Sequence, residues 1–233
     1  MWVCILLLSL GAVALALFLC EKIRKYSVKA TMIKSIASLL FITLSVYTFY
    51  KSNFNTFGIF VIVAQVFGLL GDIWLDFKYV FKEQEKTFTY AGFIVFGIGH
   101  ILYVGGMTST FMGDGWWWNL LISLGVGLIA GVAVLLMEKP LKMTYGNYKW
   151  IIFLYSVLLF MTVGTSFLVA LSQLFQNAGF NLLFIAAVSF ALSDLILCGT
   201  YFAEGKERPF DIISNGITYY LAQYLIAFSL FFI

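Results

Sequence analysis

The chain has few charged residues, one histidine, three cysteines and two prolines, and these shortages exclude several classes of protein. Of its 233 residues only 11% are charged, against about a quarter in a soluble domain, and 62% are apolar. This composition excludes a water-soluble globule, a disordered chain and a nucleic-acid binder. The cysteines lie in apolar stretches without a Cys-x-x-Cys spacing, which argues against a disulfide framework or a zinc thiolate site. One histidine, His100, is too few for a three-histidine zinc hydrolase or a histidine-rich di-iron enzyme.

Eight apolar runs dominate what is present, and each is about as long as a membrane-spanning helix, which needs ~20 residues. None shows the alternation of a barrel strand. Both prolines, Pro140 and Pro209, fall in polar separators, so no proline is expected to break a span. The sequence therefore predicts an all-α, polytopic membrane protein with eight transmembrane helices in one domain over residues 1–233. The runs cover residues 2–20, 31–50, 54–76, 89–108, 117–137, 149–170, 180–201 and 213–232.

The basic residues are distributed asymmetrically between the two sets of separators. The separators after the odd-numbered helices, with their flanks, hold all but one of the 14 basic residues, and the other side holds only Lys51. The positive-inside rule then places both termini outside the cytoplasm, in a bacterial inner membrane or in the endoplasmic reticulum of a eukaryote. The run Trp116-Trp117-Trp118 is expected at the outer interface, as part of an aromatic belt. The 13 residues are Lys22, Arg24, Lys25, Lys29, Lys34, Lys78, Lys82, Lys86, Lys139, Lys142, Lys149, Lys206 and Arg208.

Two pairs of short segments suggest an internal repeat. A Glu-Lys-x-x-Lys segment begins at Glu21 and again at Glu138, and a Leu-small-Asp-x-x-Leu segment begins at Leu70 and again at Leu192. A duplication of four helices, with halves 1–108 and 117–233, explains these pairs and would relate the halves by an axis along the membrane normal. Chance similarity between apolar helices explains them equally well.

Two acidic residues, Asp72 and Asp194, lie well inside apolar runs. An ionisable group in hydrocarbon costs at least ~2.5–3.5 kcal/mol on insertion scales, so it usually faces a cavity or a partner. Both helices descend toward the cytoplasm and carry their carboxylate at a similar depth, so the two could converge on one pocket. The alternative is a pair of structural contacts between helices. The acidic residues Asp76, Glu83 and Glu85 are expected on the solvated face of a loop that residues 82–86 lengthen.

Other polar side chains accompany the two aspartates at helical spacing. In the last helix Tyr219 and Tyr220 each share a face with Gln223, at about the depth of the carboxylates. In the fourth helix His100 and Tyr103 share a face that lies deeper. These five residues are candidate substrate-binding groups, although a satisfied core imidazole and an ordinary aromatic core explain them too.

Five short motifs follow one another along the third, fourth, seventh and eighth runs. They are Leu70-Gly71-Asp72-x-x-Leu75, Gly92-Phe93-x-x-Phe96, Gly99-His100-x-x-Tyr103, Ala191-Leu192-Ser193-Asp194-x-x-Leu197 and Tyr219-Tyr220-Leu221-Ala222-Gln223-x-Leu225-Ile226-Ala227. Their order resembles that of the YhhN family of eight-helix membrane proteins, which includes the lysoplasmalogenases related to transmembrane protein 86. The resemblance covers helices 3–4 and 7–8, whereas the other helices match in length and hydropathy alone.

The resemblance implies that the protein hydrolyses the vinyl-ether bond of a lysoplasmalogen. The products would be a fatty aldehyde and glycerophosphoethanolamine or glycerophosphocholine. Its motif positions imply catalytic roles for Asp72 and Asp194, with the five aromatic, histidine and glutamine side chains above binding the substrate.

The residues themselves suit this chemistry. A vinyl ether is cleaved when an acid protonates its β-carbon and water adds to the resulting cation, and two carboxylates supply the acid, the base and the negative charge. Neither a metal nor a nucleotide is required. A second hypothesis is a transporter or channel in which Asp72 and Asp194 bind a proton, cation or amine. A third is a scaffold in which they only join helices.

Overall fold

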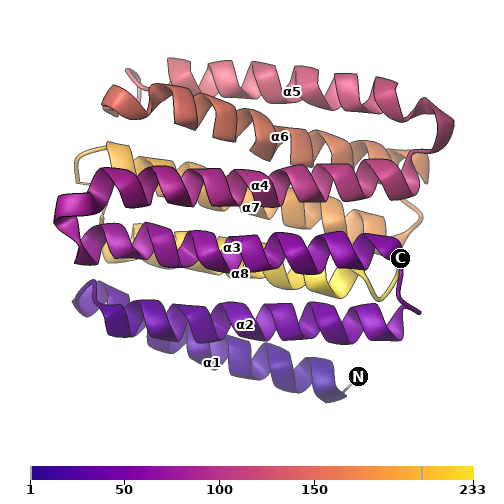
Figure 1. The fold of residues 1–233 in the computed structure, drawn as a ribbon, viewed down its shortest axis with the longest axis horizontal. Coiled ribbons are helices and arrows are strands. Elements are labelled where there is room, and N and C mark those ends of the chain that lie inside the picture. Colours follow the sequence, from indigo (N-terminus) through magenta and orange to yellow (C-terminus); the bar gives the residue numbers. More distant parts are fainter. Residues whose placement is uncertain (1, 206) are drawn as a thin grey trace.

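The computed structural model describes residues 2–205 and 207–233, which form eight α-helices joined by short connections (Figure 1). Among these residues the only β-type pairing is an isolated bridge between Met143 and Ala203. All eight predicted spans are confirmed as helices, and several continue into the polar separators. The helices are α1 (Trp2–Arg24), α2 (Val28–Lys51), α3 (Thr56–Val80), α4 (Glu85–Phe111), α5 (Trp116–Leu136), α6 (Lys149–Ser172), α7 (Ala178–Phe202) and α8 (Pro209–Ser229).

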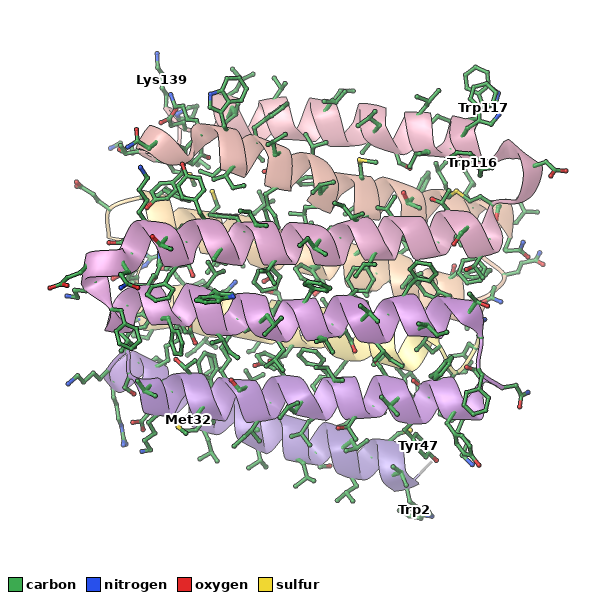
Figure 2. The ribbon with its side chains drawn as sticks, viewed as in Figure 1. Trp2, Met32, Tyr47, Trp116, Trp117 and Lys139 are labelled. Carbon is green, nitrogen blue, oxygen red and sulfur yellow. The ribbon has the colours of Figure 1, made fainter. Side chains whose placement is uncertain are left out.

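The protein is an all-α, multi-pass membrane protein. Seven of the helices in the described residues are long and apolar enough to cross a bilayer. Large apolar side chains cover the outside of the bundle, including Trp2, Met32 and Trp117, which project away from it in Figure 2. The helix outside that set, α8, is less apolar because it carries tyrosine and glutamine side chains that it buries against the other helices.

Six helices form a ring around the interior of the bundle. Each contacts the next, from α2 through α3, α4, α6, α7 and α8 back to α2. Outside the ring, α1 packs against α2 and α8, and α5 packs against α6, at opposite edges of the molecule in Figure 1. In a duplication of four helices α2 corresponds to α6 and α4 corresponds to α8. The contact between α2 and α8 then has its counterpart in the contact between α6 and α4. This pattern suits a duplicated unit of four helices, and the duplication stays a prediction.

Three expectations about the helix boundaries are wrong. Helix α3 continues to Val80, so Asp76 lies inside it, one turn after Asp72, and is only 4% exposed. The predicted span stopped at Asp76 because a hydropathy scale scores each residue alone and takes no account of the lysines that neutralise this carboxylate. Residues 82–84 form a single 3₁₀ turn and Glu85 already begins α4, so no long loop exists there. Pro209 is the first residue of α8, where its missing N–H has no helical partner to lose.

The two chain ends lie at the same end of the bundle as Trp116 and Trp117, and Lys139 lies at the opposite end (Figures 1 and 2). If the positive-inside rule sets the orientation, a C-terminal reporter that is active only in the cytoplasm should be silent. The matched control places the same reporter in the connection after α5, where it should be active. A signal from the C-terminal fusion, with none from the fusion after α5, would show that the orientation is the opposite one.

Candidate active site

The helices bring Asp72 and Asp194 to one cavity inside the ring. Asp72 lies eight residues before the end of α3 at Val80, and Asp194 lies eight residues before the end of α7 at Phe202. Both are therefore ~12 Å along their helices from the same end of the bundle. They line a shared cavity of about 30 Å³. One water needs ~10–15 Å³, so the cavity has room for two or three water molecules.

Asp72 is held by donors from two neighbouring helices. Its Oδ1 lies 3.1 Å from the Lys34 ammonium on α2. Its Oδ2 accepts hydrogen bonds from the Ser38 hydroxyl at 2.9 Å and from the Tyr219 hydroxyl at 3.0 Å. The Tyr220 hydroxyl lies 3.2 Å from Ser38 Oγ and donates to the Lys34 carbonyl at 3.1 Å. A carboxyl surrounded by one cation and two hydroxyl donors is arranged as an ionised acceptor.

The charges continue from Lys34 into a buried chain of alternating sign. Asp76 Oδ1 lies 3.5 Å from the Lys34 ammonium and 3.1 Å from that of Lys22 on α1. The Lys22 and Lys34 ammonium groups also lie over the Phe18 ring, at 5.2 and 5.6 Å from its centroid. Two cations and two anions cancel, which lowers the cost of placing these four charges in a membrane interior.

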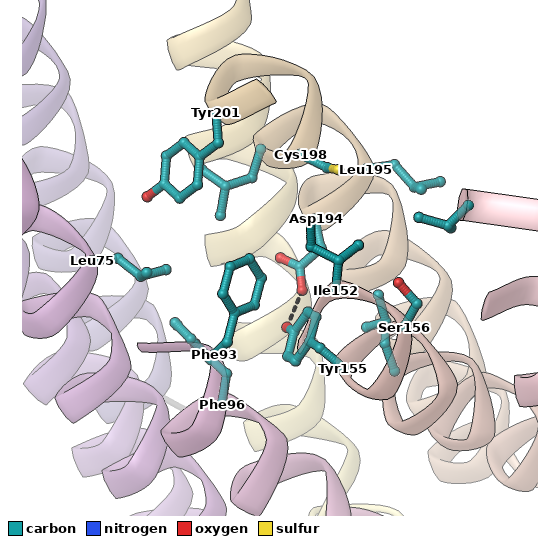
Figure 3. Close-up of a pocket in the computed structure, with 13 residues that line it drawn as sticks. Leu75, Phe93, Phe96, Ile152, Tyr155, Ser156, Asp194, Leu195, Cys198 and Tyr201 are labelled. Carbon is teal, nitrogen blue, oxygen red and sulfur yellow. Dashed lines mark hydrogen bonds between the residues drawn. The ribbon is translucent and has the colours of Figure 1, made fainter. Parts of the chain in front are cut away.

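Asp194 has a different environment from Asp72. It accepts a hydrogen bond from the Tyr155 hydroxyl of α6, drawn as the dashed line in Figure 3. Asp194 lines the shared cavity and also a second, largely apolar cavity of about 40 Å³, with Phe93, Phe96 and Tyr201 among its other lining residues. Unlike Asp72, Asp194 has no ion-pair partner among the described residues, and the neighbouring Ser193 hydroxyl is the other polar group beside it. Asp194 is therefore the carboxyl that can reach a bound molecule.

Tyr155 connects Asp194 to His100. The Tyr155 hydroxyl lies 3.4 Å from His100 Nε2, and His100 Nδ1 lies 3.0 Å from the Thr162 hydroxyl. Thr162 also donates to the Leu158 carbonyl at 3.1 Å, and in the tautomer of His100 that suits this bond Nδ1 carries the hydrogen and Nε2 accepts. The single Tyr155 hydrogen can then satisfy His100 only when Asp194 is protonated and donates to Tyr155. In that tautomer a protonated Asp194, donating to Tyr155 rather than accepting from it, satisfies all the hydrogen bonds from Asp194 through Tyr155 and His100 to Thr162.

Two of the remaining predicted residues, Tyr103 and Gln223, are connected to Asp72 through the Tyr219 hydroxyl. The Tyr103 hydroxyl donates to Gln223 Oε1 at 3.4 Å, and Gln223 Nε2 donates to the Tyr219 hydroxyl at 3.2 Å. Tyr219 and Tyr220 line the shared cavity, whereas His100, Tyr103 and Gln223 do not. The structure thus brings all seven predicted residues into two connected networks, and four of them line the shared cavity: Asp72, Asp194, Tyr219 and Tyr220.

The glycines of the motifs allow α3 and α4 to approach closely beside the site. A Cβ at Gly71 would lie 2.5 Å from the ring of Phe96, which lines both carboxylate cavities. A Cβ at Gly92 would collide with the Leu75 side chain. A larger residue at Gly71 would displace Phe96, and one at Gly92 would displace Leu75, and both of these side chains line the two carboxylate cavities.

Comparison with known proteins decides the family. The model of the YhhN family matches residues 24–230. The chain belongs to the YhhN family. Searches of the curated proteins and of the solved structures returned no match.

Several residues of this YhhN-family site were missed from the sequence. Lys34 was assigned to the basic flank, although its spacing of four from Ser38 was a signal that both share a face. Lys22 was assigned in the same way. Tyr155 had no distinguishing signal, because α6 is rich in aromatic and aliphatic residues and its partners lie on other helices.

Proposed function

We propose that this YhhN-family protein is a lysoplasmalogenase-like membrane hydrolase, which cleaves the vinyl-ether bond of lysoplasmalogens. The products are a fatty aldehyde and glycerophosphoethanolamine or glycerophosphocholine. The observation that carries the proposal is the shared cavity: Asp72 and Asp194, which lie in the motifs that resemble those of the family, line one space with room for two or three water molecules.

The different environments of the two carboxyls suggest different roles. Asp194 faces both cavities, and its protonated form completes the hydrogen bonds of Tyr155 and His100. We therefore assign Asp194 as the acid that protonates the β-carbon. Asp72, fixed as an acceptor by Lys34, Ser38 and Tyr219, supplies the negative charge that stabilises the cation next to the ether oxygen.

The proton balance closes without another reactant. Asp194 gives its proton to the β-carbon, and the vinyl double bond becomes a single bond to an oxocarbenium ion. Water from the cavity adds to the cation, and the Asp194 carboxylate takes a proton from it to restore the acid. The resulting hemiacetal then collapses to aldehyde and alcohol. Glycosidases use two carboxylates in a related way around an oxocarbenium-like transition state.

The second cavity suits the hydrocarbon part of the substrate. Its lining is dominated by apolar side chains, including Leu75, Phe93 and Ile152 in Figure 3. At about 40 Å³ this cavity is far smaller than a fatty chain, so the ring of helices must widen when lipid binds. We expect α6 and α7 to separate, because Leu195 lines this cavity and is also exposed on the membrane-facing surface.

A transporter of protons, cations or amines is the competing function, and the buried charge chain from Lys22 to Asp72 is the observation in its favour. Turnover in detergent separates the two functions, because a transporter has no gradient to use there.

The direct test incubates the purified protein in detergent with alkenyl and with acyl lysophospholipids of the same headgroup. We expect the alkenyl lipid to yield aldehyde and glycerophospho-compound in equal amounts. The acyl lipid should remain intact, because it has no double bond next to the ester oxygen that an acid could protonate at carbon. Fatty acid release from the acyl lipid, or no product from either, would contradict the proposal.

A further inference from the structure

A larger cavity, of about 240 Å³, lies at the end of the bundle beyond the carboxylates. Its walls come from the end of α3, the first turns of α4, the connection 144–148 and the end of α7. This is the end that carries most of the basic residues, so the cavity lies at the level of the lipid headgroups.

Lys78 is a buried cation in the wall of this cavity without an ion-pair partner. It is 6% exposed, and no carboxylate of the described residues lies within 4.0 Å of its ammonium. Its Nζ lies 3.2 Å from the centroid of the Tyr201 ring and 4.7 Å from that of Tyr79. The other two buried lysines, Lys22 and Lys34, are both paired with aspartates. Glu85 and Glu207 act on this ammonium only from beyond 4.0 Å. A buried ammonium usually has an anion in direct contact, and the cavity offers a place for one.

The cavity is next to the candidate active site and at a defined distance from it. Tyr201 lines this cavity and both carboxylate cavities. Lys78 lies six residues beyond Asp72 on α3, and Tyr201 lies seven beyond Asp194 on α7, which correspond to rises of about 9 and 10 Å. In a lysoplasmalogen seven bonds separate the phosphorus from the vinyl-ether β-carbon, a reach of roughly 9 Å when extended.

We propose that this cavity binds the phosphate of a lysophospholipid headgroup, with Lys78 contacting the phosphate oxygens. The assignment of the lipid rests on the proposed function, because the spacing is measured from the carboxylates. The rim suits a zwitterion: Lys86 adds a second cation, whereas Glu85, Tyr148 and Phe202 offer a carboxylate and aromatic faces to the ammonium of ethanolamine or choline.

The connection 144–148, which forms one wall of the cavity, is fixed by contacts with α5 and with the residues that flank it. Glu138 Oε1 accepts the Tyr145 N–H at 3.0 Å, and its Oε2 lies 2.9 Å from the Lys149 ammonium. The Lys149 ammonium and the Tyr145 N–H lower the pKa of Glu138. The Tyr145 hydroxyl donates to the Val134 carbonyl at 3.0 Å, which ties the connection to α5. The cavity is therefore formed before any ligand binds.

The test measures binding rather than turnover, so it holds even if the protein cleaves no lipid. The probes are 1-O-alkyl-glycerophosphoethanolamine, which has neither a vinyl ether nor an ester, and 1-O-alkylglycerol of the same chain length. We expect Lys78→Gln to weaken binding of the phospholipid about ten- to hundredfold, the range of a hydrogen bond to a charged group, and to leave the alkylglycerol unaffected. Lys78→Arg should restore most of the affinity. Lys82→Gln, a change of an exposed lysine at the same end outside the cavity, should have no effect.

Competition on the unaltered protein identifies the source of the phosphate and does not depend on any variant folding. Glycerophosphoethanolamine should displace the alkyl phospholipid at lower concentration than inorganic phosphate does, and glycerol should not displace it. Equal competition by inorganic phosphate would indicate a site for the free anion and overturn the headgroup assignment. Equal affinity of the protein for the phospholipid and the alkylglycerol, or unchanged phospholipid binding by a folded Lys78→Gln protein, would overturn the phosphate site itself.

Discussion

Replacement of Asp194 by Asn is expected to lower kcat on an alkenyl lysophospholipid by about 10²–10⁴, the usual contribution of a general acid–base group. Asn keeps the size of the side chain, and its amide can donate to Tyr155 through Nδ2 or accept from it through Oδ1, so the melting temperature should change little. An amide has no proton to give to the β-carbon, and the loss should therefore appear in kcat rather than KM. The measurement is steady-state aldehyde release by the purified protein.

The control and the double variant make this result specific. Asp114→Asn removes an exposed carboxylate at the opposite end of the bundle and should leave kcat unchanged. Asp72→Asn should also lower activity, and the double variant with Asp194→Asn should lose less than the product of the two single losses, because residues that act as a unit are not additive. Full activity of the Asp194→Asn protein would refute the assigned acid.

Replacement of Lys34 by Met is expected to give the largest loss of stability. Lys34 is the only described cation within 4.0 Å of Asp72, and it also neutralises Asp76. Removing one partner of a buried ion pair costs ~3–5 kcal/mol because it leaves an uncompensated charge. The free energy of unfolding should fall by about this amount, measured as reversible unfolding or as the shift in melting temperature in one detergent.

A neighbouring lysine of the same helix provides the matched control. Lys29 pairs with Glu21, but its side chain is 70% exposed. Exposed pairs contribute only ~0–1 kcal/mol, so Lys29→Met should be nearly neutral. If the two substitutions were equally mild, the buried chain of charges would not be an important contributor to stability.

The helices were predictable from the sequence because a span of fixed length in a medium of fixed thickness leaves a clear hydropathy signal. The shared cavity of Asp72 and Asp194 followed from the same signal, since both helices run in the same direction and carry the carboxylate at equal depth. The resemblance to the YhhN family, which the family match confirms, was noticed through motifs on the same helices.

The partners of the carboxylates were not predictable in the same way. Asp72 is contacted by Lys34 and Ser38 from the preceding helix, and Asp194 by Tyr155 from the helix before it. The pattern of a single helix does not report which faces of two helices meet. The position of Asp76 was wrong for a related reason. A scale that treats each charge alone ends the helix where a charge appears, although a paired charge can continue inside the membrane.

The alternating charges of α1, α2 and α3 also constrain biogenesis. Helix α1 carries Lys22, α2 carries Lys34 six residues after its start, and α3 carries the two aspartates that neutralise them. Lys22, near the end of α1, can snorkel to the headgroups, but Lys34 entering lipid alone would cost ~2.5–3.5 kcal/mol on insertion scales. The first two helices are synthesised before their counter-ions exist. Partition of the three helices into the bilayer as one group, after α3 has emerged from the ribosome, avoids that cost.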